Sequence, residues 1–290
     1  MDGQYIPLRS FQNIAVQARA TLHARAYARE IFHALRDEGT LRITRPQEAD
    51  LIILVGGDGF LLHSIRKYGH LGIPFLGIFF GNLGFHMNPV LRPEELVSKL
   101  IDWGSHFNVN PYPRLEVCYE LDGPHTPEET VYAFNEMRII SMHGTQALRL
   151  SLEIDDEPFN IFSGDGLLIS TPQGTTGYAI NAQGSGIEPK VPCQIIVPLH
   201  AQIAWVYRSL MVPWICLGST PVTIRVLDQK QRPAQLIHDN ADRPIVRVAA
   251  VRTRLAEQKT YLLELSDPKY RMNYWAKVAD KIIGPPRDTA

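Results

Sequence analysis

Apolar runs alternate with helical patterns in the first hundred residues of the chain. Residues 51–55 and 75–80 are apolar almost throughout, as is typical of strands buried on both faces of a parallel sheet. Residues 13–17 predict a further strand, and residues 20–35, rich in alanine, arginine and leucine, predict a helix. Further helices are predicted at residues 60–68 and 93–103. Strands that alternate with helices predict an α/β domain with a parallel sheet, which we expect to cover residues 1–107.

The pattern changes near residue 108. Pro111 and Pro113 mark the boundary, and short β-rich runs separated by turn residues follow one another beyond it. This arrangement predicts an all-β, sandwich-like second domain over residues 108–267. The runs lie at residues 115–121, 131–140, 148–154, 167–170, 195–197, 222–227, 245–251 and 261–265, with turns such as Asp122-Gly123-Pro124 and Asp155-Asp156 between them.

The tail, residues 268–290, has a pattern of its own. Trp275, Val278 and Ile282 recur there at helical spacing. We therefore expect a C-terminal helix that packs back on the first domain.

Composition narrows the classes of protein that fit. The 290 residues suit two domains. The formal net charge of −1 argues against a broad surface for nucleic acid or membranes. The three cysteines form no CxxC pair, which fits a reducing compartment, and no run reaches the ~18 apolar residues of a membrane span. We expect a cytoplasmic protein with small-molecule partners.

Gly56, Gly57, Asp58 and Gly59 form the first candidate for chemistry. They lie between the buried run 51–55 and a predicted helix. Glycine lets the backbone approach a ligand closely, and a helix start offers free N–H groups to a phosphate. The carboxylate of Asp58 is unusual beside a phosphate, so the alternative is that Asp58 simply caps the helix.

A second glycine-rich turn, Gly81-Asn82-Leu83-Gly84-Phe85, follows the apolar run 75–80. Both turns therefore stand at the carboxyl ends of predicted parallel strands. Ligands of open α/β sheets bind at those ends, so the two turns are expected to face one crevice.

Two further candidates lie in the β-rich part. Residues 164–178 combine glycines and hydroxyls that offer small donors to a polar ligand; alternatively, Thr175 or Thr176 is a helix N-cap and Asp165-Gly166 a hairpin turn. Asn135 and Glu136 can reach one ligand only if the strand ends or bulges there, and otherwise they are an exposed polar pair.

The histidines give a weaker signal. None of the ten has the spacing of a zinc site, so no metal-ligating residue is predicted. His200 and His238 are candidate ligand contacts, each with a structural role as the alternative. The Walker phosphate loop and the Gly-x-Ser-x-Gly elbow are both missing from the sequence.

Together, in this order and spacing, these stretches resemble the NAD kinase family, from the first strand to about Asp267. The resemblance implies an α/β domain, a β-sandwich domain that binds a dinucleotide, and a crevice between them. It also implies a homodimer or homotetramer in which a neighbouring subunit contributes to the site. The reaction would move the γ-phosphoryl group of ATP, or of polyphosphate, to the 2′-hydroxyl of the adenosine ribose of NAD, with Mg²⁺ or another divalent cation.

The resemblance also implies roles for single residues. Asp58 would take or orient the proton of the ribose hydroxyl, and the glycines beside it would hold the donor phosphates. Asn135 and Glu136 would bind the NAD ribose, and Asp165 the nicotinamide end. The rest of the expected ligand-binding set is Gly56, Gly57, Gly59, Phe85, Thr176, Gly177, Tyr178, Asn181, His200 and Asn240.

The chain departs from the family pattern at several positions. Phe60 stands where the family has a small or polar residue, and would either narrow the donor site or pack inward. Gly177 replaces the usual alanine, with little effect expected, and Gln173 replaces a small hydroxyl residue. Residues 199–208 resemble Gram-positive bacterial members but lack their Asn-Asn-Arg. Two alternatives to the NAD kinase function stay open: a catalytically weak sensor that binds a dinucleotide, and a related kinase that acts on a lipid or a sugar.

Overall fold

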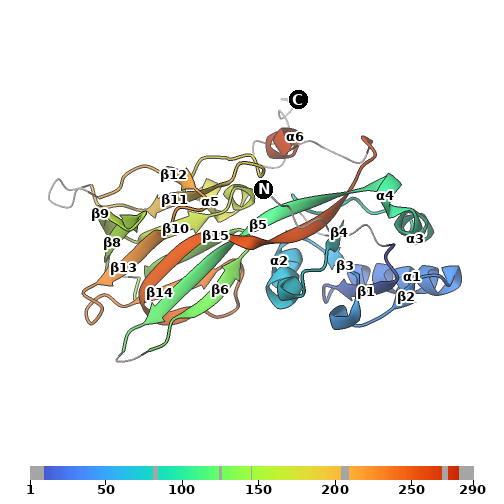
Figure 1. The fold of residues 1–290 in the computed structure, drawn as a ribbon, viewed down its shortest axis with the longest axis horizontal. Helices are drawn as coiled ribbons and strands as arrows, with labels where there is room; N and C mark the ends of the chain where they lie inside the picture. The colour runs from blue at the N-terminus through green and yellow to red at the C-terminus, as the bar shows by residue number, and fades with distance from the viewer. Residues whose placement is uncertain are drawn as a thin grey trace, which may run out of the picture. The chain divides into compact units, whose positions relative to one another are not determined.

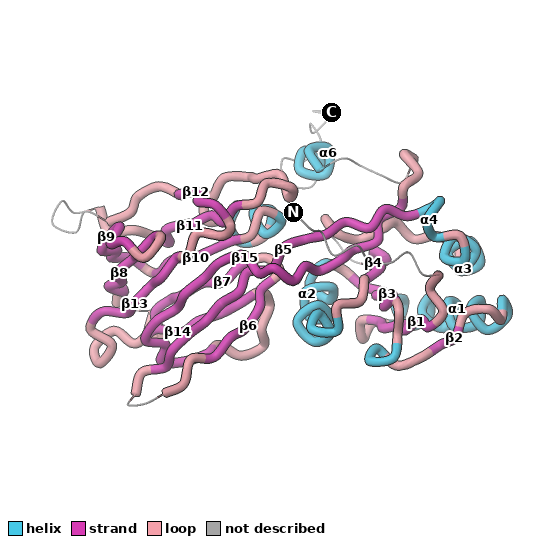
Figure 2. The backbone as a smooth tube through the Cα atoms, in the orientation of Figure 1, coloured by secondary structure: helices cyan, strands magenta, loops and turns pink. Residues whose placement is uncertain are grey.

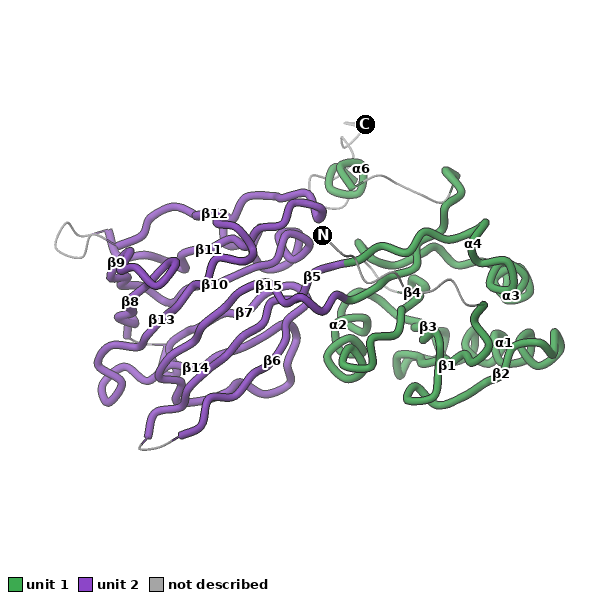
Figure 3. The backbone as a smooth tube through the Cα atoms, viewed as in Figure 1, with its two compact units in different colours: residues 1–111, 260–290 green, residues 112–259 purple. Residues whose placement is uncertain are grey.

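The chain divides into two compact units in the computed structural model. Unit 1 comprises residues 1–111 and 260–290, and unit 2 comprises residues 112–259 (Figure 3). The long strands β5 (Phe107–Leu121) and β15 (Ile245–Leu265) each continue from one unit into the other. The structure describes residues 10–80, 84–123, 126–144, 146–203, 209–269 and 274–280.

Unit 1 contains the predicted parallel sheet, in the order β2-β1-β3-β4, with the end of β15 beside β4. β3 (Leu51–Gly56) is buried along its whole length because it lies between two strands and under helices, which explains its uninterrupted apolar sequence. The other strands are β1 (Asn13–Ala18), β2 (Arg42–Ile43) and β4 (Phe75–Phe79). The helices of unit 1 are α1 (Leu22–Glu38), α2 (Asp58–Tyr68), α3 (Pro93–Ile101), α4 (Trp103–His106) and α6 (Tyr274–Val278), with short 3₁₀ turns at Pro46–Glu48 and Gly69–Leu71 (Figure 1).

Asn88 fixes the last strand of unit 1 to the first ones. Its buried amide donates to the carbonyl oxygens of Gly77 (3.0 Å) and Leu263 (2.8 Å) and accepts from the N–H of Leu265 (2.8 Å). A buried side-chain amide with all these partners satisfied adds stability and fixes the register of the strands it joins. The C-terminal part of the chain is therefore built into the N-terminal unit.

Unit 2 consists mainly of strands (Figure 2), and these pair antiparallel, as predicted. One path runs β12-β11-β10-β7-β14-β15; β13 pairs with β15 and β8, β8 with β9, and β5 with β6. Apolar side chains of these strands enclose one core cluster, which includes Leu115, Ile139, Phe162 and Leu236. The strands are β6 (Glu129–Ala133), β7 (Glu136–Ser141), β8 (Leu148–Ile154), β9 (Glu157–Gly164), β10 (Gly166–Ser170), β11 (Cys193–Leu199), β12 (Trp214–Leu217), β13 (Val222–Leu227) and β14 (Ala234–His238). The helical segments are a 3₁₀ turn at Gln173–Thr176 and α5 (Tyr178–Asn181).

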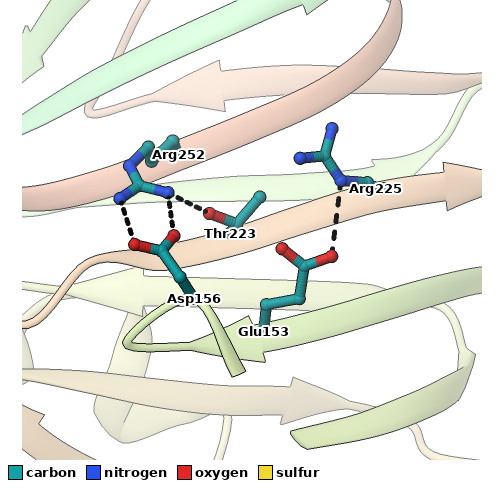
Figure 4. Close-up of polar contacts among 5 residues, drawn as sticks. All are labelled: Glu153, Asp156, Thr223, Arg225 and Arg252. Carbon is teal, nitrogen blue, oxygen red and sulfur yellow. Dashed lines mark hydrogen bonds and ion pairs between the residues drawn. The ribbon is translucent and has the colours of Figure 1, made fainter. Parts of the chain in front are cut away.

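The turn between β8 and β9 shows how the exposed side of unit 2 is stabilised. Asp155 (φ 57°) and Asp156 (φ 63°) both adopt the left-handed conformation of a two-residue hairpin turn. Arg252 donates to both carboxylate oxygens of Asp156, at 2.5 and 3.1 Å, and to the hydroxyl of Thr223 (Figure 4). The hydrogen bond from Arg252 lowers the pKa of Asp156.

We expect Asp156→Asn to lower the melting temperature slightly at pH 7, by about 1 °C, since exposed ion pairs contribute little. Because the pKa of Asp156 is lowered in the folded state, its contribution is present above the ordinary aspartate pKa and is lost as the pH falls through the folded value. Thermal unfolding of both proteins between pH 3 and pH 7 tests this. Asp155→Asn is the matched control. Asp155 lies in the same turn, and its backbone N–H, which the substitution leaves in place, donates a hydrogen bond to the carbonyl oxygen of Pro221. Equal effects of the two substitutions would contradict the role of the ion pair.

Candidate functional site

The first glycine turn joins β3 to α2 in unit 1. The N-cap of α2 is Gly57, in an extended conformation, and no side chain caps the helix. The alternative that Asp58 is the helix cap is therefore wrong. A Cβ atom on Gly56 would lie 2.9 Å from Cδ1 of Phe60, so the Phe60 ring packs against its own turn and would have to shift for any larger residue at position 56.

The carboxylate of Asp58 connects the first turn to the second. Its Oδ2 accepts from the N–H of Phe85 (2.6 Å), and its Oδ1 accepts from the N–H of His86 (3.2 Å). The turns meet because β3 and β4 are neighbours in the parallel sheet, as expected. Each carboxylate oxygen has a further lone pair for a ligand. Gly81, Asn82 and Leu83 of the second turn lie outside the described residues.

A contact at the second turn that the sequence did not reveal comes from the C-terminal helix. Nζ of Lys277, on α6, donates to the carbonyl oxygen of Phe85 at 2.9 Å. The Phe85 side chain itself is buried. The tail thus returns to the first domain, and it brings a positive charge to the turn that Asp58 holds.

In unit 2, Asn135 and Glu136 occupy the place where β6 has ended and β7 begins. The chain leaves the strand there, which is the condition under which both can serve one site. The buried carboxylate of Asp239 accepts three backbone N–H groups, from Phe134 (2.7 Å), Asn135 (2.7 Å) and Glu136 (3.2 Å). Asp239, rather than its exposed neighbour Asn240, is the residue that shapes this bend.

The hydroxyl-rich turn holds the same bend from the other side. Oγ1 of Thr171 and Nε2 of Gln173 donate to the carbonyl oxygen of Phe134, at 2.8 and 2.7 Å. A Cβ atom on Gly174 would lie 2.2 Å from the carbonyl oxygen of Asn135, so glycine is required for this close approach. Much of the turn's polar chemistry is therefore structural.

The threonines of this turn are not helix caps. The N-caps in this region are Pro172 and Gly177. The buried hydroxyl of Thr175 donates to Pro172 (2.7 Å) and accepts from the N–H of Ile187 (3.0 Å). The Thr176 hydroxyl donates to the carbonyl of Gln173 at 3.2 Å. The N-cap alternative is therefore wrong.

Glu136 is the most perturbed acid of the region. Burial, followed by the nearby carboxylate of Asp239, raises its pKa to about 8, although Arg138 opposes the shift. Its Oε2 is buried and has no hydrogen-bond partner within the described part of the chain. At pH 7 the side chain is therefore mostly protonated, and it can donate a hydrogen bond as well as accept one.

Gly177 leaves space beside this acid. A Cβ atom there would lie 3.1 Å from Oε2 of Glu136 and 3.2 Å from Nδ2 of Asn135. An alanine would require these side chains to shift by a few tenths of an ångström, so the small effect expected of Gly177 stays a prediction. The absent methyl group leaves room beside Oε2 of Glu136 at the start of α5.

Tyr178 and Asn181 are the first and last residues of α5, and both are exposed. The guanidinium carbon of Arg138 lies 4.5 Å from the centre of the Tyr178 ring. Because Arg138 follows Glu136 by two residues on β7, the two side chains share one face of the sheet. No motif in the sequence marks Arg138, and only the fold brings it to Tyr178.

Asp165 and His200 form a separate pair. Nδ1 of His200 lies 2.9 Å from Oδ2 of Asp165, and both side chains are largely exposed. His200 has a φ of 44° just after β11, while residues 204–208 lie outside the described part. The pair is open to a ligand but holds no buried polar atom.

Within the described residues, no group of three or more histidine, cysteine or acidic side chains could hold a metal ion. None of the helices in the described part of the chain is both long and apolar enough to span a membrane.

The chain matches two family models, which together cover most of its length. Residues 12–102 match the ATP-NAD kinase N-terminal domain, and residues 134–265 match the ATP-NAD kinase C-terminal domain. NAD kinase 1 of Halalkalibacterium halodurans is 31% identical over 244 residues, which is 82% of this chain and 87% of that protein. NAD kinase 2 of Bacillus subtilis is 26% identical over 87% of this chain and 90% of its own length.

Solved structures show the same fold. Yeast NADH kinase complexed with NADH superposes with a TM-score of 0.78 and 19% identity, covering 98% of this chain and 90% of that one. An NAD kinase from Archaeoglobus fulgidus in complex with ATP gives a TM-score of 0.69 and 19% identity, covering 92% of this chain and 98% of that one. With both domains matched and the expected motifs in place, the chain belongs to the NAD kinase family.

Proposed function

We propose that the protein transfers the γ-phosphoryl group of ATP to the 2′-hydroxyl of the adenosine ribose of NAD, which gives NADP. The observation that carries this function is that both kinase domains are matched, and that Asp58 of the first glycine turn is held by two backbone N–H groups. The relatives at 25–31% identity are named NAD kinases. Neither a lipid or sugar kinase nor an inactive sensor has comparable support.

Asp58 is the proposed catalytic residue. A ribose hydroxyl is a weak nucleophile and needs a proton acceptor within hydrogen-bond reach. The two N–H groups that bind Asp58 fix its position, and such preorganisation favours proton transfer. The amides of Gly56, Gly57 and Gly59 are proposed to hold the donor phosphates, while Phe60, which packs on Gly56, forms the apolar side of the turn.

ATP is proposed to arrive with Mg²⁺, whose charge neutralises the phosphates during transfer. Mg²⁺ is commonly held by one or two carboxylates together with substrate phosphates and water. Asp58 is the carboxylate at the turn that fits this pattern, through the lone pairs that its two backbone contacts leave unused.

The three free thiols, Cys118, Cys193 and Cys216, support a reducing compartment, which we propose to be the cytoplasm.

The dinucleotide is proposed to bind unit 2 at the bend around Glu136. The unpartnered Oδ1 of Asn135 and Oε2 of Glu136 suit the two hydroxyls of a ribose, each of which donates and accepts. Gly177 leaves room beside these atoms because it has no side chain. Tyr178, which follows it, provides an aromatic ring for the dinucleotide. In unit 2, Thr176, Asn181, Asp165, His200 and Asn240 are proposed as secondary contacts of the dinucleotide. Phe85 is proposed as a ligand contact of unit 1.

We also propose a homo-oligomer that forms through an apolar surface of unit 2, made of Phe159, Ile161, Met211, Val212, Trp214, Ile215 and Leu217. Each of these side chains is 38–67% exposed. Among the described strands β12 pairs only with β11, so its other edge has no strand partner in that part of the chain, and residues 209–219 contain no charge. Uncharged open edges are rare in monomers, and we propose that the same edge of a second copy pairs with this one across a two-fold axis.

Purified protein supplied with NAD, ATP and Mg²⁺ should form NADP. We expect Asp58→Asn to lower kcat by roughly 10²–10⁴-fold, because the amide keeps an acceptor oxygen but loses the basicity. Steady-state kinetics gives kcat and both KM values. Asp50→Asn is the control, since the Asp50 carboxylate also accepts two backbone N–H groups in unit 1, from Gln12 and Asn13. A kcat in Asp58→Asn equal to that of the control would exclude Asp58 as the base.

Glu136→Gln should leave NAD affinity at pH 7 nearly unchanged, because the native side chain is already mostly protonated. The raised pKa means that Glu136 costs stability as the pH rises from about 4.5 to about 8. The variant should therefore become more stable than the native protein by on the order of a few kcal/mol at pH 8.5, with little difference at pH 5. Urea unfolding at both pH values measures this, with the exposed Glu157→Gln as the control. A stability difference that is the same at both pH values would contradict the raised pKa.

The apolar surface can be tested through solution mass. Leu217→Glu places a charge on the open edge of β12 and should dissociate the native oligomer, as measured by light scattering after size exclusion. Leu22→Glu on α1, also highly exposed but in unit 1, is the control. A monomeric native protein, or an oligomer that Leu217→Glu leaves intact, would rule out this interface.

A further inference from the structure

We propose that Arg138 is a positioning residue of the dinucleotide site, where it supports the ring of Tyr178 and places a fixed positive charge beside Glu136. The proposal rests on the proposed function and adds a residue that no motif of the sequence marks. Three independent features of unit 2 support it: the place of Arg138 in the sheet, its stacking on Tyr178, and the unpartnered polar atoms around Glu136.

The backbone holds Arg138 firmly. β7 is a central strand, hydrogen-bonded to β10 on one side and β14 on the other, and Arg138 is in register with Leu168 and Ile237. Glu136 on the same face is anchored through its N–H to Asp239. The relative positions of the guanidinium and the carboxyl are therefore set by one rigid strand rather than by a loop.

The stacking gives Arg138 a specific task. Its guanidinium lies 4.5 Å from the ring centre of Tyr178, within the range of a cation–π contact. α5 has only four residues and the Tyr178 side chain is 43% exposed, so the helix alone fixes the ring poorly. The planar guanidinium supports the ring so that the flat base of a dinucleotide can pack on its exposed surface.

The polar atoms near Glu136 complete the case. Nε of Arg138, Oε2 of Glu136 and Oδ1 of Asn135 are all buried, and none has a hydrogen-bond partner within the described residues. They comprise a donor and two acceptors that burial leaves costly to keep unpaired. The paired hydroxyls of a ribose provide both kinds of partner. The charged and titratable groups around Glu136 are Asp239, which raises its pKa, and Arg138, which lowers it; a hydrogen bond from the backbone of Tyr178 also lowers it.

The test compares Arg138→Met, which removes stacking and charge, with Arg138→Lys, which keeps the charge. We expect the KM and the calorimetric Kd for NAD to rise about threefold to tenfold in both, because neither methionine nor lysine offers the planar guanidinium that stacks on the Tyr178 ring. The KM for ATP and kcat should change less than twofold. The pH at which NAD affinity responds to Glu136 should move upward in Arg138→Met and stay near the native value in Arg138→Lys.

A second substitution separates positioning from general destabilisation. In a Glu136→Gln background, Arg138→Met should no longer alter the pH dependence. Arg225→Met, which removes an exposed arginine paired with Glu153 on the same unit, is the control and should leave KM and the pH profile unchanged. An Arg138→Met protein with native NAD affinity and pH profile would overturn the proposal. Should that variant fail to fold, native NAD affinity in Arg138→Lys would overturn it instead.

The outcome is distinct from a failure of the proposed function. A native protein that forms no NADP from NAD and ATP refutes the kinase activity. The calorimetric comparison of native and variant proteins with NAD alone still decides the role of Arg138.

Discussion

A single buried carboxylate, that of Asp239, sets the geometry on which the proposed dinucleotide site depends. Asp239 accepts the N–H groups of Phe134, Asn135 and Glu136 in one cluster. Without these contacts, the buried N–H groups of Phe134 and Glu136 would lack this partner, at a cost of about 1–3 kcal/mol each, and so would the partly buried N–H of Asn135. The bend they stabilise turns both Asn135 and Glu136 out of the regular alternation of a strand. The same negative charge also helps to keep Glu136 protonated.

Unit 1 also has a carboxylate that accepts several backbone N–H groups, but this one keeps free acceptor capacity. Asp58 also gathers backbone N–H groups, from Phe85 and His86, but through only two contacts. Asp239 has a structural role, because its buried carboxylate oxygens already accept hydrogen bonds from three backbone N–H groups. Asp58 is only partly buried and has acceptor capacity left, so it can hold a turn and still serve a substrate. The number of donors around a carboxylate thus determines how much acceptor capacity it keeps for a ligand.

Local pattern was sufficient for much of the fold. The apolar run 51–55 and the glycine turn after it are strong signals, because burial on both faces and a tight strand-to-helix connection each demand particular residues. The antiparallel strands of unit 2 were likewise predicted from alternation and turn residues such as Asp155-Asp156, both of which adopt positive φ. What these segments have in common is that the physical cause lies within a few residues of sequence.

The features of the candidate site that the sequence did not predict depend on residues that are far apart in the chain. Asp239 is about a hundred residues from the bend it holds, and Lys277 is 192 residues from Phe85. Arg138 reads as one more residue of a strand until α5 places Tyr178 over it. The steric role of Gly177 depends on where the side chain of Glu136 lies. Such relations follow from tertiary packing, which composition and periodicity do not encode.

The contacts of Asn88 have a consequence for the protein while it is being synthesised. Its amide takes one partner from Gly77 and two from Leu263 and Leu265. The ribosome synthesises the N-terminal residues long before those of the last strand. Until β15 is complete, the nascent N-terminal unit therefore has one open sheet edge, and the Asn88 amide lacks its partners at Leu263 and Leu265. Exposed sheet edges invite pairing with other chains. The most aggregation-prone period of this protein's life should therefore be the interval between the synthesis of β4 and that of the end of β15.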